Sequence, residues 1–148
     1  MPKIQAAFVC KSFTQASGGF LSFDSVVQSV RVPTVPARFD EAALGIFVTE
    51  LPPDRESSLQ VALMSPTGFI ELDGQVRTNI PLQPTPYGFA QIAYNVKTLV
   101  IPTYDAYRFL FSFDGSTEVV HYAPFVVLPL SSSVHDLPSW ARPTRTRH

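Results

Sequence analysis

The chain has 148 residues, 45% of them hydrophobic and 16% charged, which suits one domain with its own core and excludes a disordered chain as the overall state. Its net charge of −1 is uneven, because residues 141–148 hold three of the eleven basic residues and no acidic one. The rest of the chain is therefore acidic, so we expect no general affinity for nucleic acid, which requires neutralised phosphates.

The beginning of the chain alternates apolar and polar residues with a period of two, the pattern of half-buried strands. In the opening strand this period places Ile4, Ala6, Phe8 and Cys10 on one face. Residues 20–32 then form one bent strand or a pair of strands, which prolines end because proline cannot donate to a β-ladder. We predict no helix, since fourteen prolines interrupt the chain.

Residues 44–48 are apolar on both faces, which predicts a central or fully covered strand. A strand at 59–63 follows and ends at the turn Ser65-Pro66-Thr67-Gly68, whose proline and glycine suit tight turn geometry. The return strand spans residues 69–80, and we expect an interruption near Asp73-Gly74.

Two apolar stripes mark the last strands of the chain. They are Ala90, Ile92, Tyr94 and Val96 in one strand, and Tyr107, Phe109, Phe111 and Phe113 in the next. Asp114-Gly115 predicts a hairpin, because this pair accepts the positive φ angles of a primed turn. Residues 119–127 return from it, and beyond Pro129 the pattern gives way to serine, proline and arginine.

These strands and the turns between them predict an all-β fold. We expect a two-sheet antiparallel β-sandwich of about seven to nine strands, immunoglobulin-like and without a disulfide. The sandwich domain spans residues 1–129, and residues 130–148 form a flexible C-terminal tail that contains serine, proline and arginine.

The stretch Asp105-Ala106-Tyr107-Arg108-Phe109 resembles the tyrosine corner of immunoglobulin-like sandwiches. The resemblance implies that Tyr107 bonds back to the backbone of its own corner. Phe109 stands where that motif has a core cysteine, and the sole tryptophan, Trp140, lies far from any central strand. The resemblance therefore implies a sandwich that is not an antibody-type domain.

A second resemblance rests on the order of strands and turns over residues 3–128. Its marks are the strand at 4–12, a glycine turn, Pro33-Thr34-Val35-Pro36, the Ser65–Gly68 turn and the hairpin of Tyr107-Arg108-Phe109 to Asp114-Gly115. In these the chain resembles a bacterial family of small β-rich proteins classed only as a domain of unknown function. The resemblance implies no activity, and the tail lies outside it.

Reactive residues are few. Cys10 and His121 form the one candidate thiolate–imidazole pair, against which we favour Cys10 as a small buried hydrophobe and His121 as an ordinary strand residue. The three histidines have no close spacing of the kind that metal sites use, and no nucleophile elbow or phosphate-binding loop is present. We expect no catalytic residue, no metal and no cofactor, and hence no enzyme.

The tail supplies the candidate partner-binding residues. Leu137 and Trp140 are apolar in a serine- and proline-rich stretch, and a tryptophan buries a large area with few rotatable bonds. Arg142, Arg145 and Arg147 follow them. The alternative is that Trp140 packs on its own domain and the arginines are solvated.

Three functions follow from these patterns. The leading one is a non-catalytic protein-binding or scaffold domain. The second is a homo-oligomeric structural subunit, in which apolar strand faces or the tail join the copies. Residues 44–48 or 125–128 could pair with another copy if either lies at a sheet edge. The third is an enzyme whose site is scattered over loops. A single cysteine, no apolar signal stretch at the N-terminus and only short apolar runs predict a cytoplasmic protein without membrane insertion.

Overall fold

The computed structural model describes residues 2–15, 21–40, 42–83 and 86–130, which contain strands and no helix. The prediction of an all-β fold with antiparallel sheets and no disulfide is confirmed. The described strands are β1 (Lys3–Gln15), β2 (Leu21–Val27), β3 (Ser29–Val32), β4 (Ala37–Phe39), β5 (Ala42–Thr49), β6 (Ser57–Ser65), β7 (Gly68–Ile70), β8 (Thr78–Leu82), β9 (Ala90–Val96), β10 (Leu99–Ile101), β11 (Ala106–Phe113) and β12 (His121–Pro129). No helix in this part of the chain is long and apolar enough to cross a membrane.

Sheet A has four strands in the order β2-β1-β5-β9, and all its ladders are antiparallel. The prediction for residues 44–48 is confirmed, because β5 is an inner strand of this sheet. Leu44, Ile46 and Val48 are fully buried on the face toward the core. On the outer face Gly45 is buried beneath the rings of Phe8 and Phe23, so this strand is covered on both sides.

Sheet B has the order β3-β12-β11-β6, and both β7 and β8 pair with the free edge of β6. The segment 20–32 thus contains two strands that belong to different sheets, since β2 lies in sheet A and β3 in sheet B. The expectation of purely antiparallel pairing is wrong at one place, because β3 runs parallel to β12. Residues 125–128 lie in β12, between β3 and β11 and not at an edge.

The expected number of sheets and strands is also corrected. β4 and β10 form a third, two-stranded antiparallel sheet, with Ala37 opposite Ile101. Three of the twelve described strands have only three residues each, namely β4, β7 and β10. Three residues are too few to show a period of two, so the sequence pattern merges or omits such strands.

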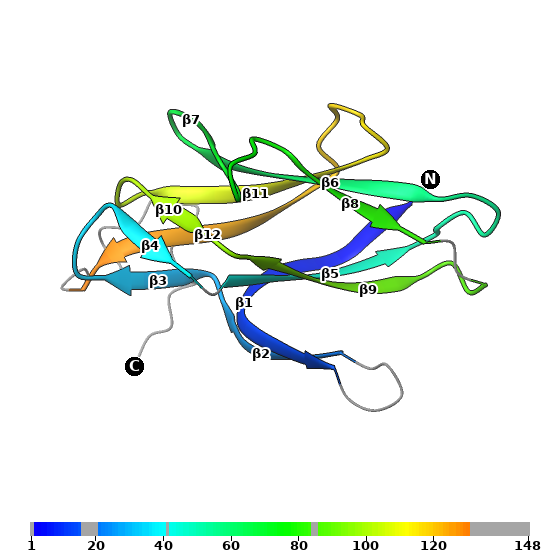
Figure 1. The fold of residues 1–148 in the computed structure, drawn as a ribbon, viewed down its shortest axis with the longest axis horizontal. Coiled ribbons are helices and arrows are strands. Elements are labelled where there is room, and N and C mark those ends of the chain that lie inside the picture. Colours follow the sequence, from blue (N-terminus) through cyan, green and yellow to red (C-terminus); the bar gives the residue numbers. More distant parts are fainter. Residues whose placement is uncertain (1, 16–20, 41, 84–85, 131–148) are drawn as a thin grey trace, which may run out of the picture.

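The two larger sheets form layers around a common core (Figure 1). In the figure β6, β11 and β12 lie above β1, β5 and β9, and the segments after β7 and β11 rise from sheet B on the side away from sheet A. The predicted stripe of Tyr107, Phe109, Phe111 and Phe113 is confirmed as the buried face of β11. It packs against residues of β5, β6, β9 and β12 in one cluster, and burial of such large apolar groups is the main stabilising contribution.

The predicted face of the opening strand is wrong. The β1–β5 ladder has a register shift between Ile4 and Ala6. After it Val9 belongs to the core cluster, whereas Phe8 and Cys10 alternate with it and lie on the outer face. Because side chains alternate with a period of two, one extra residue moves all later side chains to the opposite face.

Two Asp-Gly pairs form turns with positive φ angles at both residues. At Asp73-Gly74 the φ values are 50° and 81°, and Leu72 and Gln75 exchange backbone hydrogen bonds of 2.7 and 2.9 Å. This is the two-residue hairpin geometry that such pairs favour. Asp114-Gly115 has φ values of 53° and 75°, and it opens a longer connection that reaches β12 at His121. The hairpin predicted there is confirmed, with a later return strand than expected.

Candidate functional site

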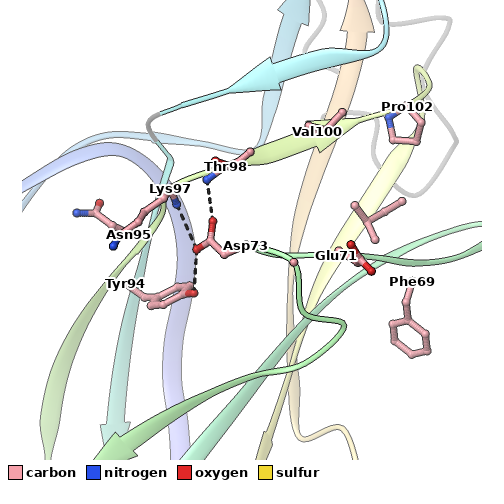
Figure 2. Close-up of a pocket in the computed structure, with 11 residues that line it drawn as sticks. Phe69, Glu71, Asp73, Tyr94, Asn95, Lys97, Thr98, Val100 and Pro102 are labelled. Atoms are coloured by element: carbon pink, nitrogen blue, oxygen red, sulfur yellow. Dashed lines mark hydrogen bonds between the residues drawn. The ribbon is translucent and has the colours of Figure 1, made fainter.

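An open groove of about 880 Å³ lies beside the ends of β7, β9 and β10. Its polar wall is the carboxylate of Asp73, which points toward the turn between β9 and β10 (Figure 2). Phe69 and Glu71 form the opposite side in the same view. A groove of this size lies within the range of small-molecule sites, so its polar groups decide whether it can carry chemistry.

Asp73 is already engaged on both oxygens. One oxygen accepts a 2.7 Å hydrogen bond from the backbone N–H of Thr98. The other accepts from the backbone N–H of Lys97 at 3.3 Å and from the Tyr94 hydroxyl at 3.4 Å. Burial raises the pKa of Tyr94, and the negative charge of Asp73 acts in the same direction. The carboxylate therefore ties the hairpin at residues 72–75 to the end of β9, which is a structural role.

The structure does not bring Cys10 and His121 together. Cys10 is buried on the outer face of sheet A, and burial raises the pKa of its thiol, with a further contribution from the nearby charge of Asp24. His121 begins β12 in sheet B, 6.3 Å from the ring of Phe111, and burial lowers the pKa of its imidazole. A thiolate–imidazole pair requires hydrogen-bond contact, which residues on different sheets and faces do not make.

The most distinctive surface feature lies on the outer face of sheet B. There β6 and β11 present Ala62 and Leu110 side by side, since these residues are direct partners in the ladder. Above them lies a recess of about 220 Å³, which we call the apolar recess. Its other lining residues are Gln60, Phe69, Val76, Arg77, Ser112, Thr117 and Val119.

Two connecting segments build the walls of the apolar recess. Arg77 joins them, because its guanidinium donates to the Ser112 hydroxyl at 3.0 Å and to the Ser116 carbonyl oxygen at 2.7 Å. Gln60 fixes the other end of the second segment by accepting a 2.8 Å hydrogen bond from the Gly115 N–H. Asp114 adds to this, since its carboxylate accepts from the backbone N–H of Ser58 at 2.9 Å. These polar contacts hold the walls in place and leave the interior apolar.

Several side chains around the apolar recess are apolar and open to solvent. Phe69 is 53% exposed, and Val76 and Val119 are each 48% exposed. Tyr122 extends the surface on β12, opposite Leu110 in the β11–β12 ladder, and carries the Arg108 guanidinium 5.2 Å above its ring. Single exposed apolar residues are ordinary on protein surfaces, whereas contiguous ones mark interaction sites.

The other predicted site residues belong to the C-terminal tail. Leu137, Trp140, Arg142, Arg145 and Arg147 all lie outside the described residues. Within the described ranges, no group of three or more histidine, cysteine, aspartate or glutamate side chains is arranged to hold a metal ion.

Comparison with models of protein families and with curated protein sequences finds no match to this chain. The candidate site therefore rests on the geometry of the apolar recess.

Sequence reasoning missed the residues of the apolar recess. A signal was present in β11, where Leu110 stands between Arg108 and Ser112 on the face opposite the aromatic stripe. An apolar residue among polar ones on a strand face is a weak signal, because exposed apolar residues are common. Val76 and Val119 lie in connections, where periodicity says nothing about which residues meet.

Proposed function

We propose that this protein is a non-catalytic protein-binding domain, and that the apolar recess on sheet B receives an apolar side chain from a protein partner. The observation that carries the proposal is the concentration of exposed apolar side chains around a recess with an apolar floor. Interfaces derive most of their affinity from a few large side chains that enter well-packed pockets. A rigid sheet surface beneath such a pocket reduces the entropy lost on binding.

The size of the apolar recess supports a side chain as its ligand. About 220 Å³ is less than the roughly 300–1,000 Å³ typical of small-molecule sites. The polar side chains at its margin also form hydrogen bonds within the protein. Arg77 donates to Ser112 and Ser116, and Gln60 accepts from Gly115. A cofactor or polar substrate would need free donors and acceptors, whereas an apolar anchor would not.

We also propose that the sandwich is immunoglobulin-like. In that class strands A, B and E share one sheet and strands C, F and G the other. Two features support the assignment. First, taken along the chain, β1, β5, β6, β9, β11 and β12 correspond to strands A, B, C, E, F and G, and they divide between the two sheets in the same way. Second, the Tyr107 hydroxyl donates to the Thr103 carbonyl oxygen at the start of β11. Membership of the bacterial family suggested by residues 3–128, and a cytoplasmic location, stay predictions from the sequence.

A displayed library of random peptides, selected on the full chain, tests the binding proposal. We expect selected peptides to share a large apolar residue and to bind the wild-type protein saturably in calorimetry. Val119→Asp and Val76→Asp each place a charge in the wall of the apolar recess, and each should weaken binding by about tenfold or more.

Val26→Asp is the matched control, because Val26 is similarly exposed at 57% but lies on β2 of sheet A. It should leave the affinity unchanged within about twofold. Thermal unfolding of each variant confirms that the fold is kept. Peptides whose affinity is the same for all three variants and the wild type would contradict the assignment of the surface, and the absence of any saturable peptide would contradict the function.

A further inference from the structure

The outer edge of sheet A is an unprotected strand. β9 pairs with β5 on one side, and no described strand pairs with its other side (Figure 1). An edge strand presents unpaired backbone N–H and C=O groups, which form a template for another strand. Proteins usually block such edges with proline, charged residues, bulges or short strands.

β9 has none of these protective features. Its seven residues, Ala-Gln-Ile-Ala-Tyr-Asn-Val, include no proline and no charge. Its ladder with β5 is continuous from Ala90 to Val96, without a register shift. None of its residues has a positive φ angle.

The other described edges of the two larger sheets each contain a protective feature, and the edge stretches of β1 and β12 that extend past β2 and β3 contain Lys3 and Pro124. β2 contains Ser25, whose φ of 56° disturbs the strand, and also Asp24. β3 has four residues and is followed by Pro33. On sheet B, β7 has three residues, and β8 contains Pro81. Among the described edges β9 therefore stands out as the one suited to pairing.

We propose that β9 pairs with β9 of a second copy of this chain, antiparallel and about a two-fold axis at Ala93, which joins two copies of sheet A into one continuous sheet. This surface is separate from the apolar recess, which lies on sheet B. A two-fold axis requires a strand that is complementary to itself.

The register about Ala93 places chemically compatible side chains opposite each other. Gln91 lies opposite Asn95 of the second copy, and paired amides can exchange hydrogen bonds. On the face toward the core, Ile92 lies opposite Tyr94, an aliphatic–aromatic pair of the kind that stabilises sheets. All overlapping positions are uncharged, so no like charges meet within the strand.

The residues that flank β9 fit the same register. Phe89 precedes the strand and is 58% exposed, and Lys97 follows it and is also exposed. Pairing about Ala93 brings Phe89 of one copy opposite Lys97 of the other, twice by symmetry. An ammonium group over an aromatic ring is attractive, whereas a register shifted toward the C-terminal end would bring the two lysines together.

Sedimentation velocity of the full chain, from about 10 µM to about 1 mM, tests the proposal, since a small interface of this kind is expected to be weak. We expect a reversible monomer–dimer equilibrium. Gln91→Lys with Asn95→Lys puts like charges opposite each other at both amide pairs and should weaken the dimer about tenfold or more. Gln91→Lys with Asn95→Glu pairs opposite charges in the same register and should restore it.

Two further experiments test whether the dimer forms through β9 in this register. Ser22→Lys with Gln28→Lys adds the same charge at exposed positions on and beside β2, at the far edge of sheet A, and should leave the dimer intact. Mixing the Gln91→Lys/Asn95→Lys protein with a Gln91→Glu/Asn95→Glu protein should give a mixed dimer. A wild-type protein that stays monomeric at about 1 mM would overturn the proposal. So would a dimer that is weakened neither by Gln91→Lys/Asn95→Lys nor by Gln91→Glu/Asn95→Glu.

Discussion

The hydroxyl of Tyr107 donates a hydrogen bond to the carbonyl oxygen of Thr103, 2.8 Å away, and accepts one from the N–H of the same residue at 3.3 Å. Tyr107 is fully buried at the start of β11. Its ring lies in the core cluster while its hydroxyl fixes the chain just before the strand. One side chain thus joins the approach to β11 to the centre of the core.

Tyr107→Phe keeps the ring and removes these hydrogen bonds. Because a partly buried carbonyl loses its donor, we expect the free energy of unfolding to fall by about 1–2 kcal/mol. Urea denaturation measures the change. Tyr122→Phe is the matched control, since Tyr122 is 52% exposed, and a cost there equal to that at Tyr107 would contradict the importance of the corner.

We expect Asp73 to stabilise the fold through its hydrogen bonds and to have no catalytic role. Asp73→Ala removes acceptors from Thr98, Lys97 and Tyr94, and we expect a loss of about 1–3 kcal/mol in urea denaturation. Asp73→Asn keeps one oxygen acceptor and tolerates the positive φ angle of this position, so it should cost less. Equal losses for the two variants would show that the hydrogen bonds are not the source of the effect.

Gly45 gives the outer face of sheet A room for its aromatic cluster. A Cβ atom at this position would overlap the ring of Phe8 and lie 2.8 Å from that of Phe23. These two rings pack edge to face at 5.0 Å, so neither moves freely. Gly45→Ala should destabilise the protein by about 1–3 kcal/mol through overpacking.

The Phe8→Leu background tests that mechanism. A smaller side chain at position 8 leaves space for the new methyl group, so Gly45→Ala should cost less there than in the wild-type protein. The difference is the coupling energy of a double-mutant cycle. If the cost of Gly45→Ala is the same in both backgrounds, the clash with Phe8 is not its cause.

His121 predicts the direction of one pH dependence. Burial lowers its pKa in the folded protein below the usual 6.5. The unfolded chain therefore binds a proton more readily in the window below pH 6.5, and folding stability falls as the pH falls through that window. His121→Gln removes this contribution, so its stability should depend less on pH between about 7 and 5 than that of the wild type. An unchanged pH dependence would contradict a lowered pKa for the partly buried imidazole.

The strands with long apolar stripes could be predicted from the sequence. The aromatic stripe of β11 is a strong signal because aromatic residues recur at every second position, and β5 is strong because it is apolar on both faces. The hairpin at Asp114-Gly115 was visible for a local reason, since few residue pairs accept two positive φ angles.

Other features depend on contacts that a linear pattern does not contain. The sequence of residues 20–32 does not indicate that β2 and β3 belong to different sheets. The register shift after Ile4 does not change the alternation of apolar and polar residues in the sequence. The apolar recess joins Ala62, Val76 and Leu110 from three separate parts of the chain. Such a site appears only once the order of the strands is known.

Methyl NMR of the full chain, titrated with N-acetyl-tryptophan amide, tests the central claim most directly. The methyl groups of Ala62, Val76, Leu110 and Val119 report on the apolar recess, and that of Val26 reports on sheet A. We predict saturable shifts at the first four, with Val26 unchanged. Shifts that do not saturate, or that appear equally at Val26, would contradict the assignment of the apolar recess as a binding site.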